Sequence, residues 1–213
     1  MKKVTKQMNT WGSEFGKEWT GRCALGVEGT DQRFKDDVGS TRTEMYQEFL
    51  ADVDRDIRVL EVACNIGTQL ATLGRLGFQH LYGVELQDYA VQKSRESNPH
   101  LNIIQGSAFD VPFKDSYFGL VYTSVFLIHI SPDDLSEAMA EIHRCSNRYI
   151  VGYEYYADAY TEVSYRGHDD LLWKTNFCQA YLDQFPGLQV VKRKKYNYSN
   201  GNVDEMFLLE KTS

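Results

Sequence analysis

The sequence predicts one α/β domain whose open, mostly parallel sheet ends in an antiparallel hairpin. Two observations predict this fold class. From about residue 57 onward, short β-type apolar runs alternate with segments of helical periodicity, as expected for parallel strands joined by crossover helices. Near the end of the chain, two further β-type runs flank Ser199-Asn200-Gly201-Asn202, and Asn-Gly is a strong signal for a hairpin turn.

The composition is that of a globular protein. The chain has 213 residues, 42% hydrophobic and 25% charged, enough apolar surface for a sizeable core. Without repeats or a linker, we expect a single domain in which residues 1–53 form a helical N-terminal arm or lid over residues 54–213. Within the arm, Trp11, Phe15 and Trp19 recur at helical spacing. A glycine-rich stretch over residues 21–39 separates them from a second helix, expected over residues 41–51.

In the body of the chain, recognisable signals bound the expected elements. The first helix stops at Gly77, and the second breaks at Asn98-Pro99. Ser131-Pro132-Asp133-Asp134 opens the next helix with an N-cap, a proline and acidic residues in the first turn. The expected helices cover residues 68–76, 88–97, 132–145 and 169–185. The expected strands cover residues 57–63, 81–85, 101–104, 118–124 and 149–153, followed by the hairpin runs 188–198 and 205–210.

Charge and cysteine usage exclude several kinds of partner. The formal net charge of −7 repels nucleic-acid phosphates and anionic membrane surfaces, so we expect neither partner. No apolar run approaches the roughly twenty residues of a membrane span, and the N-terminus lacks the apolar core of a signal peptide; we expect a cytoplasmic protein. The four cysteines form no Cys-x-x-Cys pair, and Asp133 and Asp134 fit a first helical turn. We therefore predict no metal site.

The candidate ligand site lies where the first two strands end, because open parallel sheets bind ligands beyond the carboxyl ends of their strands. The first strand ends in Glu61-Val62-Ala63-Cys64-Asn65-Ile66-Gly67, and the second ends in Glu85, whose carboxylate can accept both hydroxyls of a ribose. The turn has one glycine, whereas dinucleotide binders need three to admit a pyrophosphate. These residues favour an adenosine that bears a cation. The alternative is a plain turn in which Glu61 pairs with an arginine.

Glu61–Gly67 resembles motif I of the class I S-adenosylmethionine-dependent methyltransferases, an acidic residue followed by x-G-x-G-x-G, with Ala63 and Asn65 replacing two glycines. Other segments resemble the same family in order and spacing, namely residues 83–85 (GVE), 105–113 (QGSAFDVPF), 118–121 (FGLV) and 128–129 (IH). The resemblance covers residues 57–211. It implies a Rossmann-like class I methyltransferase fold with a seven-stranded sheet, and S-adenosyl-L-methionine as a cofactor that leaves as S-adenosyl-L-homocysteine.

The whole chain also resembles a subgroup described as pseudaminic acid biosynthesis-associated methylases. The shared features are Trp11, Glu14-Phe15-Gly16, Asn65-Ile66-Gly67 and the segment 162–174. The chain departs from the subgroup at Arg22-Cys23, where Arg-Asn is expected. The subgroup name reports gene context more than chemistry, so it suggests an acidic or amino sugar as methyl acceptor without identifying it.

The family resemblance also implies which residues bind the cofactor. Glu85 would hold the ribose hydroxyls, Glu61 would lie near the methionine ammonium, and Leu86 would pack on the adenine. An aromatic wall from Trp11, Trp19 or Tyr122 would favour the sulfonium; alternatively, the two tryptophans belong to a helix that only covers the sheet. The remaining predicted cofactor residues fall into three groups. Along the methionine portion would lie Ala63, Cys64, Asn65 and Gly67. Ser107 and Ala108 would meet the adenine edge, and Ser124 and Val125 would lie under the sulfonium.

The methyl acceptor is expected at the ends of the fourth and fifth strands and in the segment after them. Methyl transfer depends mainly on alignment, and a hydroxyl acceptor also profits from a general base. His129 and Glu154 are the catalytic candidates; the alternatives are a histidine that caps the sheet edge and a glutamate in a salt bridge. Arg166 is suited to grip a substrate carboxylate. The predicted substrate-binding residues are Tyr122, Tyr156, Tyr165, Arg166 and His168.

The sequence thus predicts a monomeric or homodimeric methyltransferase that acts on a small molecule, such as an acidic or amino sugar of the nonulosonic acid type or its precursor. Three alternatives stay open. The acceptor could be a protein or an RNA, and the altered motif I and Gly119 are compatible with a protein that binds S-adenosylmethionine without catalysis. A nicotinamide-dependent oxidoreductase is disfavoured by the missing glycines and by Glu61.

Overall fold

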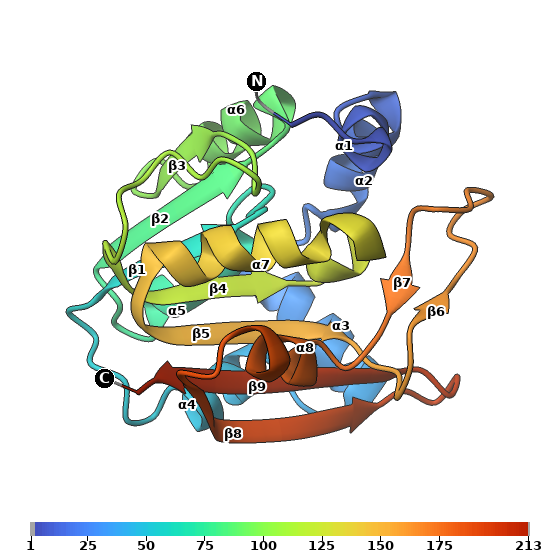
Figure 1. Cartoon of the computed structure of the whole chain (residues 1–213). Helices are drawn as coiled ribbons and strands as arrows, with labels where there is room; N and C mark the ends of the chain where they lie inside the picture. Colours follow the sequence, from blue (N-terminus) through green and yellow to red (C-terminus); the bar gives the residue numbers. More distant parts are fainter. Residues whose placement is uncertain (1–2, 213) are drawn as a thin grey trace.

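A computed structural model describes residues 3–212, and Figure 1 shows their arrangement. The helices are α1 (Lys6–Trp11), α2 (Glu14–Cys23), α3 (Gly26–Val38), α4 (Arg42–Phe49), α5 (Thr68–Arg75), α6 (Asp88–Ser97), α7 (Pro132–Cys145) and α8 (Phe177–Gln184), with a short 3₁₀ helix η1 (Leu127–His129). The strands are β1 (Arg58–Val62), β2 (His80–Glu85), β3 (Asn102–Gln105), β4 (Phe118–Ser124), β5 (Ser146–Tyr155), β6 (Thr161–Glu162), β7 (Trp173–Lys174), β8 (Leu188–Asn197) and β9 (Val203–Lys211).

The main sheet has seven strands in the order β3-β2-β1-β4-β5-β9-β8. Strands β1 to β5 are parallel, whereas β9 runs antiparallel to both β5 and β8. The predicted fold class, a mostly parallel seven-stranded sheet with a terminal antiparallel hairpin, is confirmed. The strand order reverses direction between β1 and β4, which places the topological switch point at the carboxyl end of β1.

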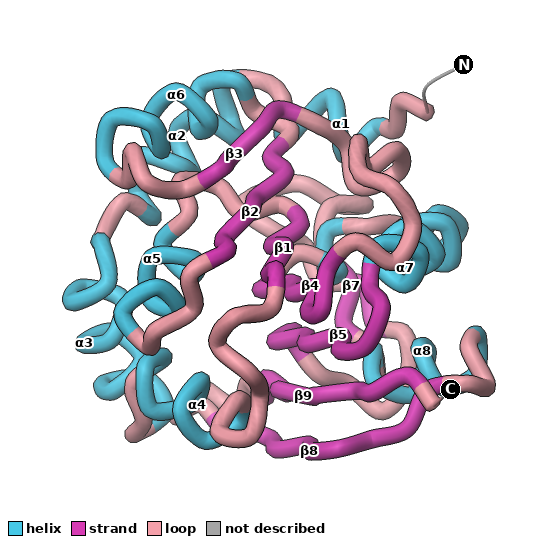
Figure 2. The backbone as a smooth tube through the Cα atoms, turned by 90° about the vertical axis from the view of Figure 1, so that its left-hand side faces the viewer, coloured by secondary structure: helices cyan, strands magenta, loops and turns pink. Residues whose placement is uncertain are grey.

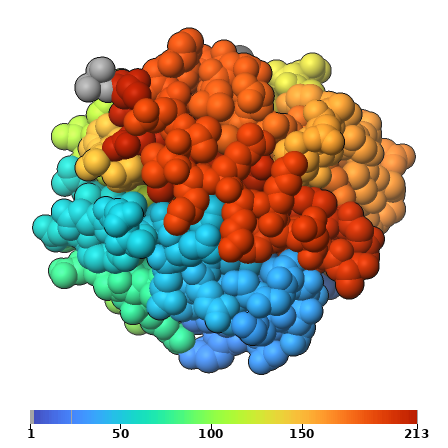
Figure 3. Space-filling model, turned by 90° about the horizontal axis from the view of Figure 1, so that it is seen from below, coloured from blue at the N-terminus to red at the C-terminus, as the bar shows by residue number. Residues whose placement is uncertain are grey.

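Helices cover both faces of this sheet, as Figure 2 shows from its edge. On one face of the sheet, α7 buries Leu135, Ala138, Met139 and Ile142. These residues share one hydrophobic core with side chains of α8, β4, β5 and β9. On the other face, α4, α5 and α6 pack over residues such as Val59 and Leu120. Figure 3 shows the α3–α4 segment against the C-terminal hairpin, where Lys194 of β8 pairs with Glu48 at 2.7 Å.

The N-terminal arm differs from the expectation in two ways. The helical spacing of Trp11, Phe15 and Trp19 is interrupted, because α1 ends at Gly12 and Ser13 caps α2 by accepting a bond from the Phe15 amide. The stretch 21–39, expected to separate two helices, itself contains α3. Two of its four glycines lie at the boundaries of α3: Gly26 and Gly39 have φ of 66° and 78°, and Gly39 ends the helix in the left-handed conformation.

The helix expected over residues 169–185 is also corrected. Helix α8 begins at Phe177, because the Asn176 side chain caps it by accepting a bond from the Gln179 amide. The preceding residues belong to a flap, residues 156–176, in which β6 and β7 pair antiparallel. The other expected helices and strands agree with the structure within a few residues at their ends.

Helix α4 is tied to the sheet by an arginine with no exposed surface. The guanidinium of Arg42 donates hydrogen bonds to the hydroxyls of Tyr46, Tyr122 and Ser124, and it lies 3.9 Å from the centroid of the Tyr153 ring. Within residues 3–212, no ion pair joins it to a carboxylate. Burial works against its charge, but the surrounding tyrosines outweigh that effect and raise the pKa of Arg42, so it stays cationic.

We predict that Arg42→Leu lowers the free energy of unfolding by about 3 kcal/mol, because it leaves buried hydroxyls without their donor. Arg95→Leu, at an exposed position of α6, should change it by less than about 0.5 kcal/mol. Urea unfolding followed by circular dichroism measures both. Equal stability of the two variants would contradict a structural role for the buried guanidinium.

Candidate active site

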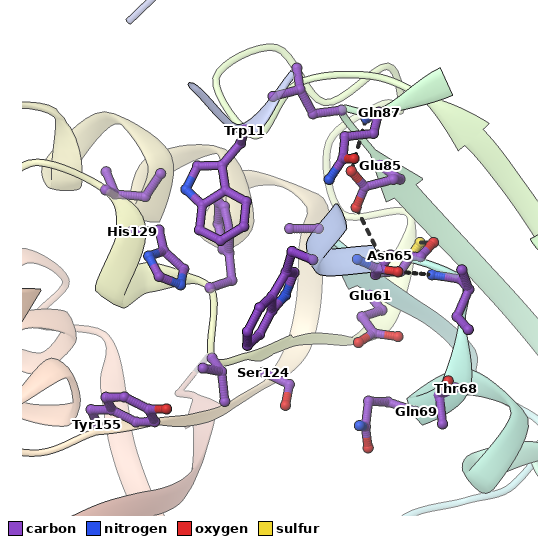
Figure 4. Close-up of a pocket in the computed structure, with 18 of the residues that line it drawn as sticks. Trp11, Glu61, Asn65, Thr68, Gln69, Glu85, Gln87, Ser124, His129 and Tyr155 are labelled. Carbon is purple, nitrogen blue, oxygen red and sulfur yellow. Dashed lines mark hydrogen bonds between the residues drawn. The ribbon is translucent and has the colours of Figure 1, made fainter. Parts of the chain in front are cut away.

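A pocket opens at the carboxyl ends of β1, β2 and β4, under the arm (Figure 4). Its cavity volume is about 270 Å³, close to the lower end of the roughly 300–1,000 Å³ that ligand pockets span. Of the predicted cofactor and catalytic residues, it is lined by Trp11, Trp19, Glu61, Ala63, Cys64, Asn65, Glu85, Leu86, Ser124, Val125 and His129.

The turn after β1 keeps the backbone of a glycine-rich turn with only one glycine. Ala63, Asn65 and Gly67 have φ of 60°, 50° and 79°, all in the left-handed region. Asparagine tolerates this conformation, whereas alanine is strained in it. At Gly67 a side chain would also collide, since a Cβ there would lie 2.7 Å from methyl carbons of Leu101 and Ile103. The two replaced glycines therefore leave the shape of the turn intact.

Glu85 ends β2 and faces this turn. Its two carboxylate oxygens accept hydrogen bonds from the backbone N–H groups of Asn65 and Gln87, both at 2.8 Å. The side chain is 5% exposed, and burial raises its pKa despite these bonds. The carboxylate is thus fixed in orientation, with lone pairs left for further donors.

Glu61 lies at the floor of the pocket beneath the turn (Figure 4). It is 2% exposed, and burial, reinforced by the charge of Glu85 and opposed by Arg42, raises its pKa well above the usual value. Its Oε2 atom has no hydrogen-bond partner within residues 3–212. A cationic or donor group of a ligand would satisfy this oxygen and stabilise its charge.

The arm forms the roof of the pocket. Thr20 of α2 accepts a 3.0 Å bond from the side-chain amide of Asn65, which ties the arm to the turn. Trp11 packs on His129, with 4.5 Å between ring centroids, and Trp11 and Trp19 also contact Tyr165 of the flap. The indole Nε1 of Trp11 is buried without a hydrogen-bond partner in the described chain.

His129 follows β4 at the end of η1 and is held in one protonation state. Its Nδ1 lies 2.8 Å from the carbonyl oxygen of Leu171, so this nitrogen carries the hydrogen and Nε2 keeps a lone pair. Burial lowers the pKa of the ring to about 4, so the imidazole is neutral at pH 7. His129 can accept a hydrogen bond or a proton.

Glu154, the other catalytic candidate, lies beside the pocket and not in its lining. Its carboxylate accepts a 2.9 Å bond from the Phe126 amide at the start of η1, the short helix that carries His129. The side chain is 1% exposed, and burial raises its pKa to about 8. This geometry gives Glu154 a positioning role for η1.

The structure does not bring the other predicted residues to the pocket lining. Tyr122 is buried, and its hydroxyl is hydrogen-bonded to Arg42 and Tyr46. Ser107 accepts a bond from the Phe109 amide, and its neighbour Ala108 packs against the core under α7. Gly67 caps α5. Tyr156 donates to Asp158 at the base of the flap.

Three predicted substrate residues lie on the flap, above the roof. Tyr165 and His168 exchange backbone hydrogen bonds, and the guanidinium of Arg166 lies 5.0 Å from the Trp19 ring centroid. The ring of His168 lies 5.0 Å from that of Phe15. Arg166 lines a second hollow with Trp19 and Arg22, on the outer side of the roof. The structure therefore places this group next to the pocket, separated from it by Trp19.

Several residues around the pocket were missed in the sequence. Asp204, Tyr198 and Tyr155 line its end over the hairpin, and Thr30, Arg33 and Phe34 of α3 complete it. One signal was present for Asp204, since Asp204-Glu205 is an acidic pair at the start of an apolar β-run. Arg42 also had one, because it shares a helix face with Met45 and Phe49.

Comparisons of sequence agree with this geometry. Residues 60–148 match the family model described as a methyltransferase domain. An uncharacterised methyltransferase of Synechocystis is 30% identical over 87 residues, which are 41% of each chain. The chain spans only about two fifths of the length of the curated relatives it matches, 38% and 41%.

Solved structures share the fold at low identity. Magnesium protoporphyrin IX methyltransferase from Synechocystis, solved with bound S-adenosylhomocysteine, has a TM-score of 0.71 at 12% identity, with 96% of this chain and 98% of that one covered. PH0226 protein from Pyrococcus horikoshii has a TM-score of 0.71 at 15% identity, with 94% and 99% covered. These findings confirm the Rossmann-like fold, and they show that residues 60–148 are similar to a methyltransferase domain.

We predict that Ala63→Gly raises the free energy of unfolding by about 1 kcal/mol, because it relieves a left-handed alanine. Ala140→Gly, inside α7, should lower it by about 1 kcal/mol. Thermal unfolding of both variants provides the test. A loss of stability in both would show that residue 63 is not strained.

We predict that Glu154→Gln changes the pH dependence of stability. The folded-state pKa of about 8 lies above that of an unfolded glutamate, so the native state binds the extra proton and wild-type stability falls as the pH rises toward 8. Glutamine does not titrate, so from pH 5 to pH 8 the variant should gain about 3 kcal/mol relative to wild type. Urea unfolding at both pH values measures this gain; a difference that does not change with pH would contradict it.

Proposed function

We propose that this protein is an S-adenosyl-L-methionine-dependent methyltransferase that acts on a small molecule. The observation that carries the proposal is the turn after β1, whose three left-handed residues stand where the class has glycines, beside the fixed carboxylate of Glu85. The methyltransferase-domain match over residues 60–148 supports the same function.

The residues of the pocket fit this cofactor. Glu85 would accept the ribose hydroxyls, which need an acceptor-only partner of fixed orientation. The partnerless Oε2 of Glu61 would receive the ammonium of the methionine portion along Ala63–Asn65. Burial raises the pKa of Glu61 and of Glu85 in the empty pocket, and the positive charges of the bound cofactor would favour their ionised forms.

The chemistry needs little beyond this positioning. The bound cofactor supplies an electrophilic methyl group, and the protein aligns an oxygen or nitrogen nucleophile with it. Neutral His129, with a lone pair on Nε2, can accept a hydrogen bond from such a nucleophile and so orient it toward the methyl group. Glu154 would keep His129 in place through the start of η1, and Trp11 and Trp19 of the roof would cover the reacting groups on one side.

The covered pocket favours a small acceptor over a protein or an RNA. Its roof is packed onto the flap, with Gln7 donating to the Asp170 carbonyl at 3.0 Å and Lys6 paired with Asp170. The resemblance to the pseudaminic acid subgroup makes sugars and their precursors the first acceptors to assay. A protein that binds S-adenosylmethionine without catalysis is the second candidate, because residue 63 departs from the family motif.

We predict that the wild-type protein binds S-adenosylhomocysteine with micromolar affinity and that Glu85→Ala weakens this binding about a hundredfold, since two hydroxyls lose a charged acceptor. Glu96→Ala, at an exposed position of α6, serves as the matched control and should bind like wild type. Isothermal titration calorimetry measures all three.

Retained affinity in Glu85→Ala would refute the assignment of the ribose site. Absence of binding to S-adenosylhomocysteine and S-adenosylmethionine in the wild-type protein would refute the proposed function as a whole. Binding without methyl transfer to any of a broad panel of sugars and amines would favour the non-catalytic alternative.

A further inference from the structure

One end of the pocket lies beyond the residues that fit the cofactor. Asp204 is the second residue of β9 and pairs in register with Tyr155 at the end of β5, so both lie at the same edge of the sheet as the carboxyl ends of the parallel strands. Tyr198, just after β8, lines the pocket beside them. This end of the pocket is available to a second ligand.

Asp204 is a buried carboxylate with an unused oxygen. It is 1% exposed, and its Oδ2 accepts a 2.7 Å bond from the Tyr198 hydroxyl. Its Oδ1 has no hydrogen-bond partner among residues 3–212. Leaving a buried carboxylate oxygen without a donor is costly, so this position in a pocket is suited to a ligand that brings an O–H or N–H group.

The charges around Asp204 decide which ligands it can receive. The charged side chains that line the pocket are Glu61, Glu85, Asp204 and Arg33, so acids outnumber bases. Arg33 is more than half exposed and lies 3.5 Å from Asp37, which offsets its charge. An anionic group brought to this end of the pocket would meet a buried carboxylate and be repelled.

Two further cations act on Asp204 from outside the lining. Burial raises the pKa of Asp204. Hydrogen bonds from the hydroxyls of Tyr198 and Tyr153, and the charges of Arg42 and Lys174, oppose that shift and favour the ionised form. Both cations already have partners: Lys174 donates to the side-chain oxygen of Asn202, and Arg42 donates to its three hydroxyls. They support the carboxylate as a hydrogen-bond acceptor without offering a free site for an anion.

We propose that Asp204 binds the methyl acceptor, and that this acceptor presents an amino or hydroxyl group, and no carboxylate or phosphate, to this end of the pocket. The inference rests on the proposed function, because it places the acceptor next to the cofactor. It specifies which part of the acceptor meets Asp204: an O–H or N–H donor lies at this end of the pocket, and any carboxylate or phosphate of the acceptor lies elsewhere.

The next residue on β9 provides a matched control. Glu205 is 2% exposed and also has a partnerless oxygen, but successive residues of a strand point to opposite faces. Its other oxygen pairs with Arg193 at 2.7 Å, away from the pocket lining. Asp204→Asn and Glu205→Gln each replace a buried carboxylate by the matching amide, but only Asp204 lines the pocket.

The test uses cofactor analogues as probes, since the acceptor is unidentified. In S-adenosylhomocysteine derivatives, the sulfur carries an alkyl arm that ends in an amino, hydroxyl, carboxylate or methyl group, in a series of arm lengths from two to five carbons. Calorimetry gives the affinity of each probe for wild type, Asp204→Asn and Glu205→Gln. We expect an amino or hydroxyl arm of at least one length to bind about tenfold tighter than its methyl counterpart, and the carboxylate arm to bind weaker.

Asp204→Asn should abolish the preference of the wild-type protein for donor arms over methyl arms and reduce its discrimination against carboxylate arms, whereas Glu205→Gln should keep both. Equal affinity for all arms at every length, tighter binding of carboxylate arms, or a preference that survives Asp204→Asn would overturn the inference. The wild-type comparison decides the matter even if a variant does not fold. Binding of S-adenosylhomocysteine without arm selectivity overturns only this inference; no binding of S-adenosylhomocysteine overturns the proposed function with it.

Discussion

The sharp turn after β1 is the constraint on which the site depends, because it joins the sheet, the arm and the pocket. Ala63 donates its amide hydrogen to the Val84 carbonyl of β2, and Asn65 links Glu85 on one side to Thr20 of the arm on the other. Gly67 lets the start of α5 approach the strand that carries Ile103. A backbone that must turn left-handed three times costs free energy, and the surrounding bonds hold it in place.

Buried charged side chains are the second feature that shapes the site. Arg42 is the cation beneath the pocket, and Glu61, Glu85 and Asp204 are the acids that line it. Because Arg42 donates its hydrogen bonds to hydroxyl groups, it compensates the negative charges of these acids only partly. A cationic ligand, or one that brings O–H or N–H donors, would therefore stabilise the ionised carboxylates. The same balance favours amino or hydroxyl groups over anionic groups at the Asp204 end of the pocket.

Sequence patterns predicted the sheet and many of the residues that line the pocket around Glu85, because strand periodicity and the position of Glu85 after β2 are local signals. They failed where tertiary contacts override local ones. Gly26 and Gly39 bound a helix in a stretch that was expected only to separate two helices, and Asn176 starts α8 later than periodicity suggests. Asp204 reaches the pocket only through the return of β9 along β5, which brings together residues far apart in the chain.

The most direct test of the account is a crystal structure of the protein with bound S-adenosylhomocysteine. We predict that the ribose hydroxyls lie within hydrogen-bond distance of Glu85, that the ammonium contacts Glu61, and that the sulfur opens toward the space before Asp204. A ligand bound elsewhere, or an adenosine whose hydroxyls do not reach Glu85, would contradict the central claim that this pocket is a methyl-donor site.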